Sequence, residues 1–309
     1  MRSVTFTGLL QVAALLTVAF SLVTLLPVDH HSIQLFTHFR LQYLVGSLLL
    51  LTVFAFLRDR AYTTALAVSM LANATVVMPW YVDVAENSGE SQLKLMSVNA
   101  LSTNVEHDRL FALLSAEQPD LVFVQEISPQ WEKALTAVHP DYPYRYAEAR
   151  EGNFGIALLS RLPLARVDHV DSPPFGFPTL QGEVAIGDHT LRFVSTHPMV
   201  PLGASNFSAR NEQLQQVAQQ LGASSTSTIL VGDLNASMWG LHYRRLESAT
   251  GLRNARRGHG ILPTWPTFMP FAMIPIDHVL VSSDIGVSRI ETGPSIGSDH
   301  LPLIVTLSL

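Results

Sequence analysis

The C-terminal stretch IGSDHLPLIVTLSL, residues 296–309, places a polar triplet directly before an apolar run. The run is rich in leucine and β-branched residues, which predicts a final buried strand. The triplet is Ser298, Asp299 and His300. A carboxylate inside a doubly buried strand carries a large desolvation cost, whereas at the end of a strand it can meet solvent or a metal ion. The stretch therefore predicts a polar site at the end of the last strand.

The same combination recurs along residues 93–309, where predicted strands alternate with a few helices. The strands are LKLMSVN (93–99), PDLVFVQE (119–126), FGIALLS (154–160), HTLRFVSTH (189–197), STILVGDLN (227–235) and IDHVLVS (276–282). Polar side chains end several of these strands, namely Asn99, Glu126, His197, Asp233 and Asn235. We expect these polar strand ends to converge on one site.

Each of these residues also has a purely structural interpretation. A strand-end acid such as Glu126 can pair with a lysine or cap a helix, and the D-x-N pattern of Asp233 and Asn235 is typical of an Asx turn. Asp277 lies inside the apolar run IDHVLVS, and a buried acid requires a partner. A histidine ring is the natural partner, because a carboxylate fixes its tautomer and raises its basicity, and His300 is the best match.

Seven short motifs, SVN, PDLVFVQE, GIALLSRLP, STH, VGDLNA, IDHVLVS and SDHLPL, occur in the order in which they occur in the endonuclease/exonuclease/phosphatase superfamily. The chain resembles this superfamily over about residues 93–309. The resemblance implies an α+β fold, a four-layer α/β/β/α sandwich of two stacked mixed sheets, and metal-dependent hydrolysis of phosphate esters. One departure is Leu101, which stands where several nucleases of the superfamily carry an acid.

The resemblance implies that oxygen ligands hold a hard divalent cation. Mg²⁺, for which Mn²⁺ can substitute, often takes only one or two carboxylates and keeps its other positions for water and substrate phosphate. The implied ligands are Glu126 as the principal ligand, Asn99 in support and Asp299 as a second carboxylate.

The catalytic residues implied by the resemblance act on water and on phosphate. Asp233 would position or deprotonate the attacking water, and Asn235 would hold the phosphate. His300, oriented by Asp277, would hydrogen-bond the scissile phosphate and stabilise the pentavalent transition state. The remaining candidates for contact with phosphate are His197, Arg210, Asn104 and Asn153.

The first 83 residues are more apolar than the rest and predict a membrane anchor, because uncharged runs of such length are rare in soluble folds. The predicted spans are residues 4–26, 41–57 and 62–82, followed by a linker over 84–92; the alternative is three buried helices of a soluble domain. Three spans would place the basic residues Arg2, Arg58 and Arg60 on the same side of the membrane. Basic residues in short loops favour the cytoplasmic side, so this side is predicted to be cytoplasmic, although Arg40 weakly opposes this orientation. The catalytic domain would then face the periplasm from a bacterial inner membrane.

Composition limits the chemistry further. The 309 residues include no cysteine, which excludes disulfides, thiolate metal sites and a thiol nucleophile. The formal net charge of −6 weakens the case for tight non-specific binding of nucleic acid. Two stretches have open roles. Five arginines within 244–257 either border the site, face anionic lipid or are solvated, and LPTWPTFMPFAMIP (262–275) is a substrate lid, a membrane-dipping loop or an ordinary packed loop.

These features together predict a membrane-anchored, Mg²⁺-dependent phosphoesterase that hydrolyses a phosphomonoester or phosphodiester by in-line attack of water, with a lipid-linked or headgroup phosphate as a candidate substrate. The expected partners are the bilayer and a phosphate-ester substrate, either a lipid or a nucleic acid, with no obligate protein partner. One alternative is an extracytoplasmic endonuclease or exonuclease. An alternative of another class is a catalytically silent, membrane-tethered binding module.

Overall fold

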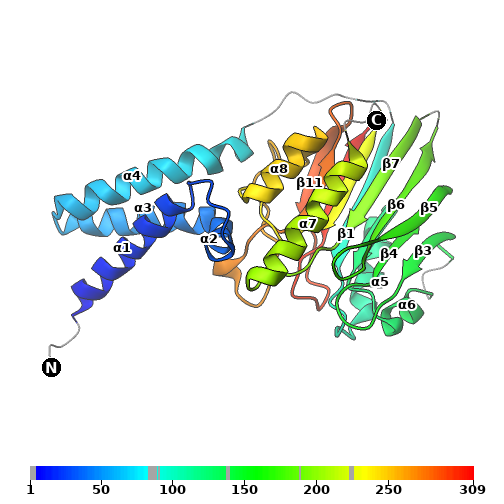
Figure 1. Ribbon diagram of the computed structural model, residues 1–309, viewed down its shortest axis with the longest axis horizontal. Helices are drawn as coiled ribbons and strands as arrows, with labels where there is room; N and C mark the ends of the chain where they lie inside the picture. Colours follow the sequence, from blue (N-terminus) through cyan, green and yellow to red (C-terminus); the bar gives the residue numbers. More distant parts are fainter. Residues whose placement is uncertain (1–4, 83–88, 90, 137–139, 188, 223–225) are drawn as a thin grey trace.

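The computed structural model describes residues 5–82, 89, 91–136, 140–187, 189–222 and 226–309. A bundle of long helices formed by residues 5–82 lies at one end of an α/β domain that begins with β1 (Figure 1). Most of the expected linker over 84–92 lies outside the described residues.

The N-terminal bundle contains the three expected apolar helices. Its elements are α1 (Phe6–Val23), α2 (His31–Phe36), the 3-10 turn η1 (Thr37–Phe39), α3 (Arg40–Phe56), α4 (Arg60–Val77) and the 3-10 turn η2 (Met78–Tyr81). Among the described residues, three segments are helical, long and apolar enough to cross a membrane, namely Phe6–Val23, His31–Phe56 and Arg60–Tyr81. The second segment begins well before the expected residue 41, because α2 and η1 run directly into α3.

The outer surface of the bundle is apolar and its interior holds a polar network. Phe6, Leu49 and Phe56 are exposed, as expected for side chains that face lipid. Inside the bundle, the buried Arg40 guanidinium donates to the Ser21 carbonyl at 2.9 Å and to Asn73 Oδ1 at 3.3 Å. Arg40 therefore lies within the second candidate span and not in a loop.

Two mixed, six-stranded sheets stack face to face in the described part of the α/β domain. The first has the order β11-β12-β1-β2-β4-β3, with β1 (Gln92–Asn99), β2 (Leu121–Gln125), β3 (Tyr144–Glu148), β4 (Ile156–Ser160), β11 (Gly286–Thr292) and β12 (Leu303–Ser308). The second has the order β5-β6-β7-β8-β10-β9, with β5 (Leu164–Ser172), β6 (Phe177–Ile186), β7 (His189–Thr196), β8 (Thr228–Asp233), β9 (Arg253–Asn254) and β10 (Asp277–Val281).

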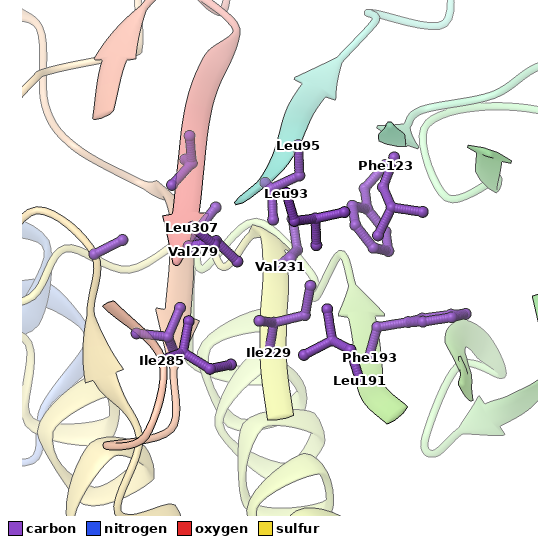
Figure 2. Packing of buried hydrophobic residues seen from close by; sticks show 14 of the residues in the cluster. Leu93, Leu95, Phe123, Leu191, Phe193, Ile229, Val231, Val279, Ile285 and Leu307 are labelled. Atoms are coloured by element: carbon purple, nitrogen blue, oxygen red, sulfur yellow. The ribbon is translucent and has the colours of Figure 1, made fainter. Parts of the chain in front are cut away.

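The inner faces of the two sheets form the main core. Figure 2 shows Leu95 and Phe123 of the first sheet above Phe193, Ile229 and Val231 of the second. The Phe123 and Phe193 rings meet edge to face, with centroids 5.6 Å apart. These strands are apolar on both faces because each sheet is covered on its outer side as well.

Helices cover both outer faces and complete the expected four layers. The first sheet packs on α5 (His107–Glu117) and α6 (Pro129–Leu135), and the second on α7 (Ala204–Leu221) and α8 (Leu241–Thr250). The cluster beside α7 and α8 also contains Val77 and Trp80 of the N-terminal bundle. Bundle and domain thus share a core, and the predicted four-layer sandwich is confirmed.

Candidate active site

The site lies at the sheet edge where β1 and β8 end and β10 begins. Asp277 is the register partner of Asp233, because β10 runs antiparallel to β8, and Asn99 pairs with Gln125 in the parallel β1–β2 ladder. Glu126 follows directly on β2. Strand pairing within each sheet and stacking of the two sheets therefore bring polar residues that are distant in sequence to one edge, as the strand-end pattern predicts.

The Asn99 side chain joins the acids of the two sheets. Its Nδ2 donates to Glu126 Oε1 at 3.0 Å and to Asp233 Oδ2 at 3.2 Å, and it lies 3.5 Å from His300 Nε2. Its Oδ1 accepts from the Leu101 N–H at 3.1 Å. All four polar side chains in this cluster are buried, so the amide stabilises two carboxylates where water is scarce.

Glu126 and the loop after β1 have an unusual backbone. Glu126 has φ +62° and Leu101 has φ +58°, both in the left-handed region that side chains rarely adopt. The turn lets the Ser102 N–H donate to Glu126 Oε2 at 3.3 Å. Burial raises the pKa of Glu126, and His197 and Asn99 offset only part of that effect. Strained backbone of this kind is typical of functional sites.

His300 carries a proton at neutral pH. Its Nδ1 lies 2.9 Å from Asp277 Oδ2, and its Nε2 lies 3.6 Å from Asp233 Oδ2. Burial alone would lower the pKa of His300, but these two carboxylates outweigh it and raise the pKa to about 10. Ser298 Oγ accepts from the His300 N–H at 3.1 Å and donates to the Asn99 carbonyl at 2.8 Å, which ties the triplet to β1.

The Asp233 segment is both an Asx turn and part of the site. Asp233 Oδ1 accepts from the Asn235 N–H at 2.9 Å, and Asn235 has φ +48°. The Asn235 amide donates to the Pro198 carbonyl at 3.0 Å and lies 3.3 Å from His197 Nε2. Burial works to raise the pKa of Asp233, yet His300 and His197 lower it to about 2, so this carboxylate stays ionised.

The cluster has the donors that a hard divalent cation prefers. The Glu126 carboxylate is buried. Among the described residues, its ion-pair partner is His197, with Nε2 3.9 Å from Glu126 Oε1. Asp233, Asp277 and His300 also present possible ligand atoms within 4.8 Å of one another. The short distances between His300 and the two carboxylates also make these three residues an ion cluster. A cation beside Glu126 would offset its desolvation, so the residues present fit the metal that the fold implies.

Asp299, the third expected ligand, is partly exposed beside this cluster. Its Oδ2 accepts from the Trp265 indole N–H at 2.9 Å, and its carbonyl accepts from the Thr267 N–H at 2.9 Å. The Trp265 and His300 ring centroids are 6.3 Å apart. Asp299 therefore holds the loop after Trp265 against the site, and its role as a metal ligand stays a prediction.

The expected phosphate contacts occupy different positions. The buried Arg210 donates to the Asn235 carbonyl at 2.7 Å and supports the Asp233 turn from behind. Asn104 donates to the carbonyls of Ala100 at 3.2 Å and Ile296 at 3.1 Å, so its amide holds two loops together. The exposed Asn153 accepts from Ser102 Oγ at 2.6 Å, close to Glu126. Contact of these side chains with phosphate stays a prediction.

Several features near the site were not predicted. The Phe154 ring stacks on Phe177 at 3.5 Å and lies 5.6 Å from the His197 ring, forming an aromatic wall. Phe177 belongs to the apolar stretch SPPFGFPT (172–179), but the sequence does not indicate that its ring meets Phe154. The pentapeptide GPSIG (293–297) has the spacing of a serine-hydrolase motif, but it lies in the β11–β12 loop with Ser295 exposed.

The arginine-rich stretch faces the N-terminal bundle. Arg245 pairs with Asp29 at 3.1 Å, and the Arg257 guanidinium lies 4.9 Å from the centre of the Trp80 ring. Arg256 is fully buried and donates to the Leu262 carbonyl at 3.1 Å. Arg245 and Arg257 therefore contact the N-terminal bundle, whereas Arg256 bonds within the domain.

A charged histidine can neutralise charge on a phosphate oxygen and an ionised aspartate can orient water, which is chemistry that suits a metal-dependent phosphoesterase. The model of the Endonuclease/Exonuclease/phosphatase family matches residues 96–300. The chain belongs to this family, and it is a hydrolase that acts on phosphate ester bonds. The search of the curated proteins found no match.

Solved structures confirm the fold. TDP2 from D. rerio, in complex with a single-strand DNA product, has 18% identity and a TM-score of 0.61, and the match covers 71% of this chain and 100% of that chain. A family protein from Beutenbergia cavernae has 20% identity and a TM-score of 0.60, covering 71% and 72%. The 3′ phosphatase NExo from Neisseria, bound to a product DNA hairpin, has 17% identity and a TM-score of 0.57, covering 69% and 98%.

Proposed function

We propose that the protein is a membrane-anchored, Mg²⁺-dependent phosphoesterase that hydrolyses a phosphomonoester or phosphodiester by in-line attack of water. The observation that carries the proposal is the Asn99 amide, which joins Glu126 and Asp233 beside the charged His300. A buried cluster with this composition has little structural use at a sheet edge, since apolar side chains would be more stable there. For the same reason a catalytically silent binding module is the weaker interpretation.

In the proposed mechanism, Glu126 would hold the cation, and the Asn99 amide positions Glu126 by its hydrogen bond to Oε1. The cation, Mg²⁺ or Mn²⁺, would neutralise charge on the phosphate oxygens, and Asp299 is the proposed second ligand. Asp233, ionised because its pKa is about 2, accepts a hydrogen bond from the attacking water and orients it.

The phosphate is bound from the other side of the cluster. His300 donates from Nε2 to a phosphate oxygen, and Asp277 keeps this ring protonated and correctly oriented. His197 and the Asn235 amide contact a second oxygen, while Arg210, Asn104 and Asn153 are peripheral candidates. Each hydrogen bond strengthens as charge develops in the transition state.

The proposed division of the chain is a membrane anchor over residues 1–83, a linker over 84–92 and a catalytic domain over 93–309. We propose that the three candidate spans cross a bacterial inner membrane and that the catalytic domain faces the periplasm. Support comes from Arg58 and Arg60, which lie at the α3–α4 connection at the far end of the bundle from the domain (Figure 1). A C-terminal reporter active only outside the cytoplasm is expected, and cytoplasmic activity would overturn the orientation.

The activity test uses the purified full-length protein with and without added Mg²⁺. The substrates are p-nitrophenyl phosphate, bis(p-nitrophenyl) phosphate, DNA, phospholipids, inositol phosphates and isoprenoid phosphates. We expect Mg²⁺-dependent turnover that Glu126→Gln lowers by about a hundredfold or more, because the variant loses the ligand charge. Glu183→Gln, at a partly exposed ion pair, is the matched control. Turnover unaffected by Glu126→Gln or by chelation would refute the site assignment.

The second candidate function is an extracytoplasmic nuclease. It is favoured by the Phe154–Phe177 wall beside His197, because nucleobases stack on aromatic rings. Binding to duplex or single-stranded DNA should then weaken steeply as salt rises, through release of counterions. Cleavage of a small phosphate ester without such salt dependence would favour the first function.

A further inference from the structure

The segment from Trp265 to Ile274, here called the apolar loop, leaves and re-enters the domain at one place. Trp265 and Ile274 form an isolated antiparallel bridge that closes its base. Its tip is four consecutive exposed residues, of which Phe268 is 71% exposed, Met269 38% and Phe271 79%. The segment carries no charged residue. Large exposed aromatic side chains on an uncharged loop indicate a surface that another apolar phase covers.

Two contacts place this region at the level where the candidate spans meet the domain. Gln42 Nε2, in the first turn of α3, donates to the Met273 carbonyl at 2.7 Å. The Gly260 N–H donates to the Trp80 carbonyl at 2.7 Å, at the end of the third candidate span. Figure 1 shows the apolar loop, in orange, beside α2 on the side of the domain that faces the bundle. The apolar loop is therefore continuous with the lipid-facing surface of the bundle.

The base of the apolar loop is part of the candidate active site. Asp299 accepts from the Trp265 indole at 2.9 Å and from the Thr267 N–H at 2.9 Å, and His300 is the next residue. The hydrogen bonds of Asp299 to Trp265 and Thr267 thus connect the tip of the apolar loop to His300, the residue that would bind phosphate.

We infer that Phe268, Met269 and Phe271 insert into the outer surface of the bilayer and set the active site against it, so that the substrate is a phosphate ester in the headgroup of a membrane lipid. Amphipathic segments with exposed aromatic side chains bury them at the boundary between headgroups and acyl chains. The substrate part of this inference rests on the proposed phosphoesterase function. The docking part depends only on the loop and the bundle.

Docking can be tested without activity, because the chain has no cysteine. A single cysteine at Phe271, labelled with an environment-sensitive fluorophore, reports its surroundings in full-length protein reconstituted into phosphatidylcholine–phosphatidylglycerol vesicles. We expect blue-shifted emission that lipids spin-labelled high on the acyl chain quench. The control is Val170→Cys, 43% exposed on the edge strand β5, which should remain in water. A water-like spectrum at position 271, or a shift that appears only when a second copy binds, would overturn docking.

The substrate class is tested by comparing a lipid phosphate with soluble esters. Phe268→Ser combined with Phe271→Ser should lower hydrolysis of dioleoyl phosphatidate or phosphatidylcholine in vesicles by about a hundredfold or more, since burial of each phenylalanine is worth about tenfold or more. Turnover of p-nitrophenyl phosphate and bis(p-nitrophenyl) phosphate should be unchanged. Equal loss on all substrates, or hydrolysis of soluble esters alone by the wild type, would overturn the lipid substrate. Absence of all turnover with an inserted label would instead refute the phosphoesterase function.

Discussion

At the scale of single residues, the charge on His300 depends on its two carboxylate neighbours. Asp277 is buried and contacts Nδ1, whereas Asp233 faces Nε2. The two acids are register partners on adjacent strands, so the backbone ladder fixes the geometry of the pair. One acid can then hold the ring while the other remains available to water.

Asp277→Asn should lower activity by about a hundredfold, a typical contribution of one acid–base group. The variant keeps the shape of the side chain but removes the negative charge that raises the pKa of His300 to about 10. The wild type should remain active at pH values at which His300 of the variant has already lost its proton. The measurements are the pH–rate profile and an NMR titration of His300. Asp171→Asn, at an exposed ion pair with Arg150, is the control, and an unchanged His300 titration in Asp277→Asn would contradict the assignment.

His278 predicts how the domain responds to acid. The ring is fully buried, its Nε2 donates to the Ala236 carbonyl at 2.7 Å, and Arg256 lies 3.3 Å from Nδ1. Burial and Arg256 lower its pKa from 6.5 to about 3. Between these values the unfolded chain binds a proton that the folded chain does not, so stability falls as pH falls.

His278 alone should change the free energy of unfolding by about 1.4 kcal/mol per pH unit in this range. The measurement is the free energy of unfolding of full-length protein in detergent at several pH values. In His278→Gln, which keeps a donor for the Ala236 carbonyl, the slope below pH 6.5 should decrease by that amount. The same slope in wild type and variant would show that the pKa of His278 is not lowered.

The site residues could be predicted singly but not as a network. The motif order predicted that Glu126, Asp233 and His300 meet, and the need of a buried acid for a partner matched Asp277 to His300. The central position of Asn99 was not predictable, because its bonds to Glu126 and Asp233 span 27 and 134 residues and depend on how the sheets stack. Spacing in sequence carries no information about such distances.

At the scale of secondary-structure elements, burial decided which strands could be recognised. The strands β1, β2, β8, β10 and β12 are buried almost throughout and read as apolar runs. In β5, exposed and half-buried positions mix without regular alternation, so its sequence LARVDHVDS resembles a loop. The short helix α2, with sequence HSIQLF, is too short for helical periodicity and was missed.

The segment formed by α2 and η1 contacts the loop that follows β8. The buried His38 in η1 accepts, at Nδ1, the Ser237 N–H at 3.1 Å, and Gln34 Oε1 accepts the Leu241 N–H at 2.9 Å. Ser237 follows Asn235 closely in the chain, so the N-terminal bundle holds the backbone of the loop that carries the proposed phosphate-binding amide. The N-terminal bundle is in this sense a structural part of the candidate site.

His38→Leu should therefore raise KM more than it lowers kcat, with a total loss in kcat/KM of about tenfold, since one buried hydrogen bond is worth about 1–2 kcal/mol. His38→Asn, whose Oδ1 can replace Nδ1 as the acceptor, should recover most of the loss. The measurement is steady-state kinetics in detergent on bis(p-nitrophenyl) phosphate. Equal defects in both variants would indicate a packing role instead of a hydrogen bond to the loop.

At the scale of the whole molecule, bundle and domain form a shared hydrophobic interface. Val77 is 1% exposed and Trp80 is 6% exposed, and both belong to the cluster that includes Trp239 and Ile261 of the domain. The Trp239 indole N–H donates to the Val76 carbonyl at 3.3 Å. A flexible tether would need none of these contacts.

The shared interface predicts that residues 91–309 alone are poorly stable, whereas residues 76–309 are much closer to the full-length protein. Removing Val77 and Trp80 uncovers apolar surface worth about 3–6 kcal/mol, at about 1.5–3 kcal/mol for each large side chain. That is a large share of the 5–15 kcal/mol that typically stabilises a domain. Urea unfolding of the two fragments should give midpoints that differ accordingly, with aggregation of the shorter one. Equal midpoints would show that the N-terminal bundle only tethers the catalytic domain to the membrane.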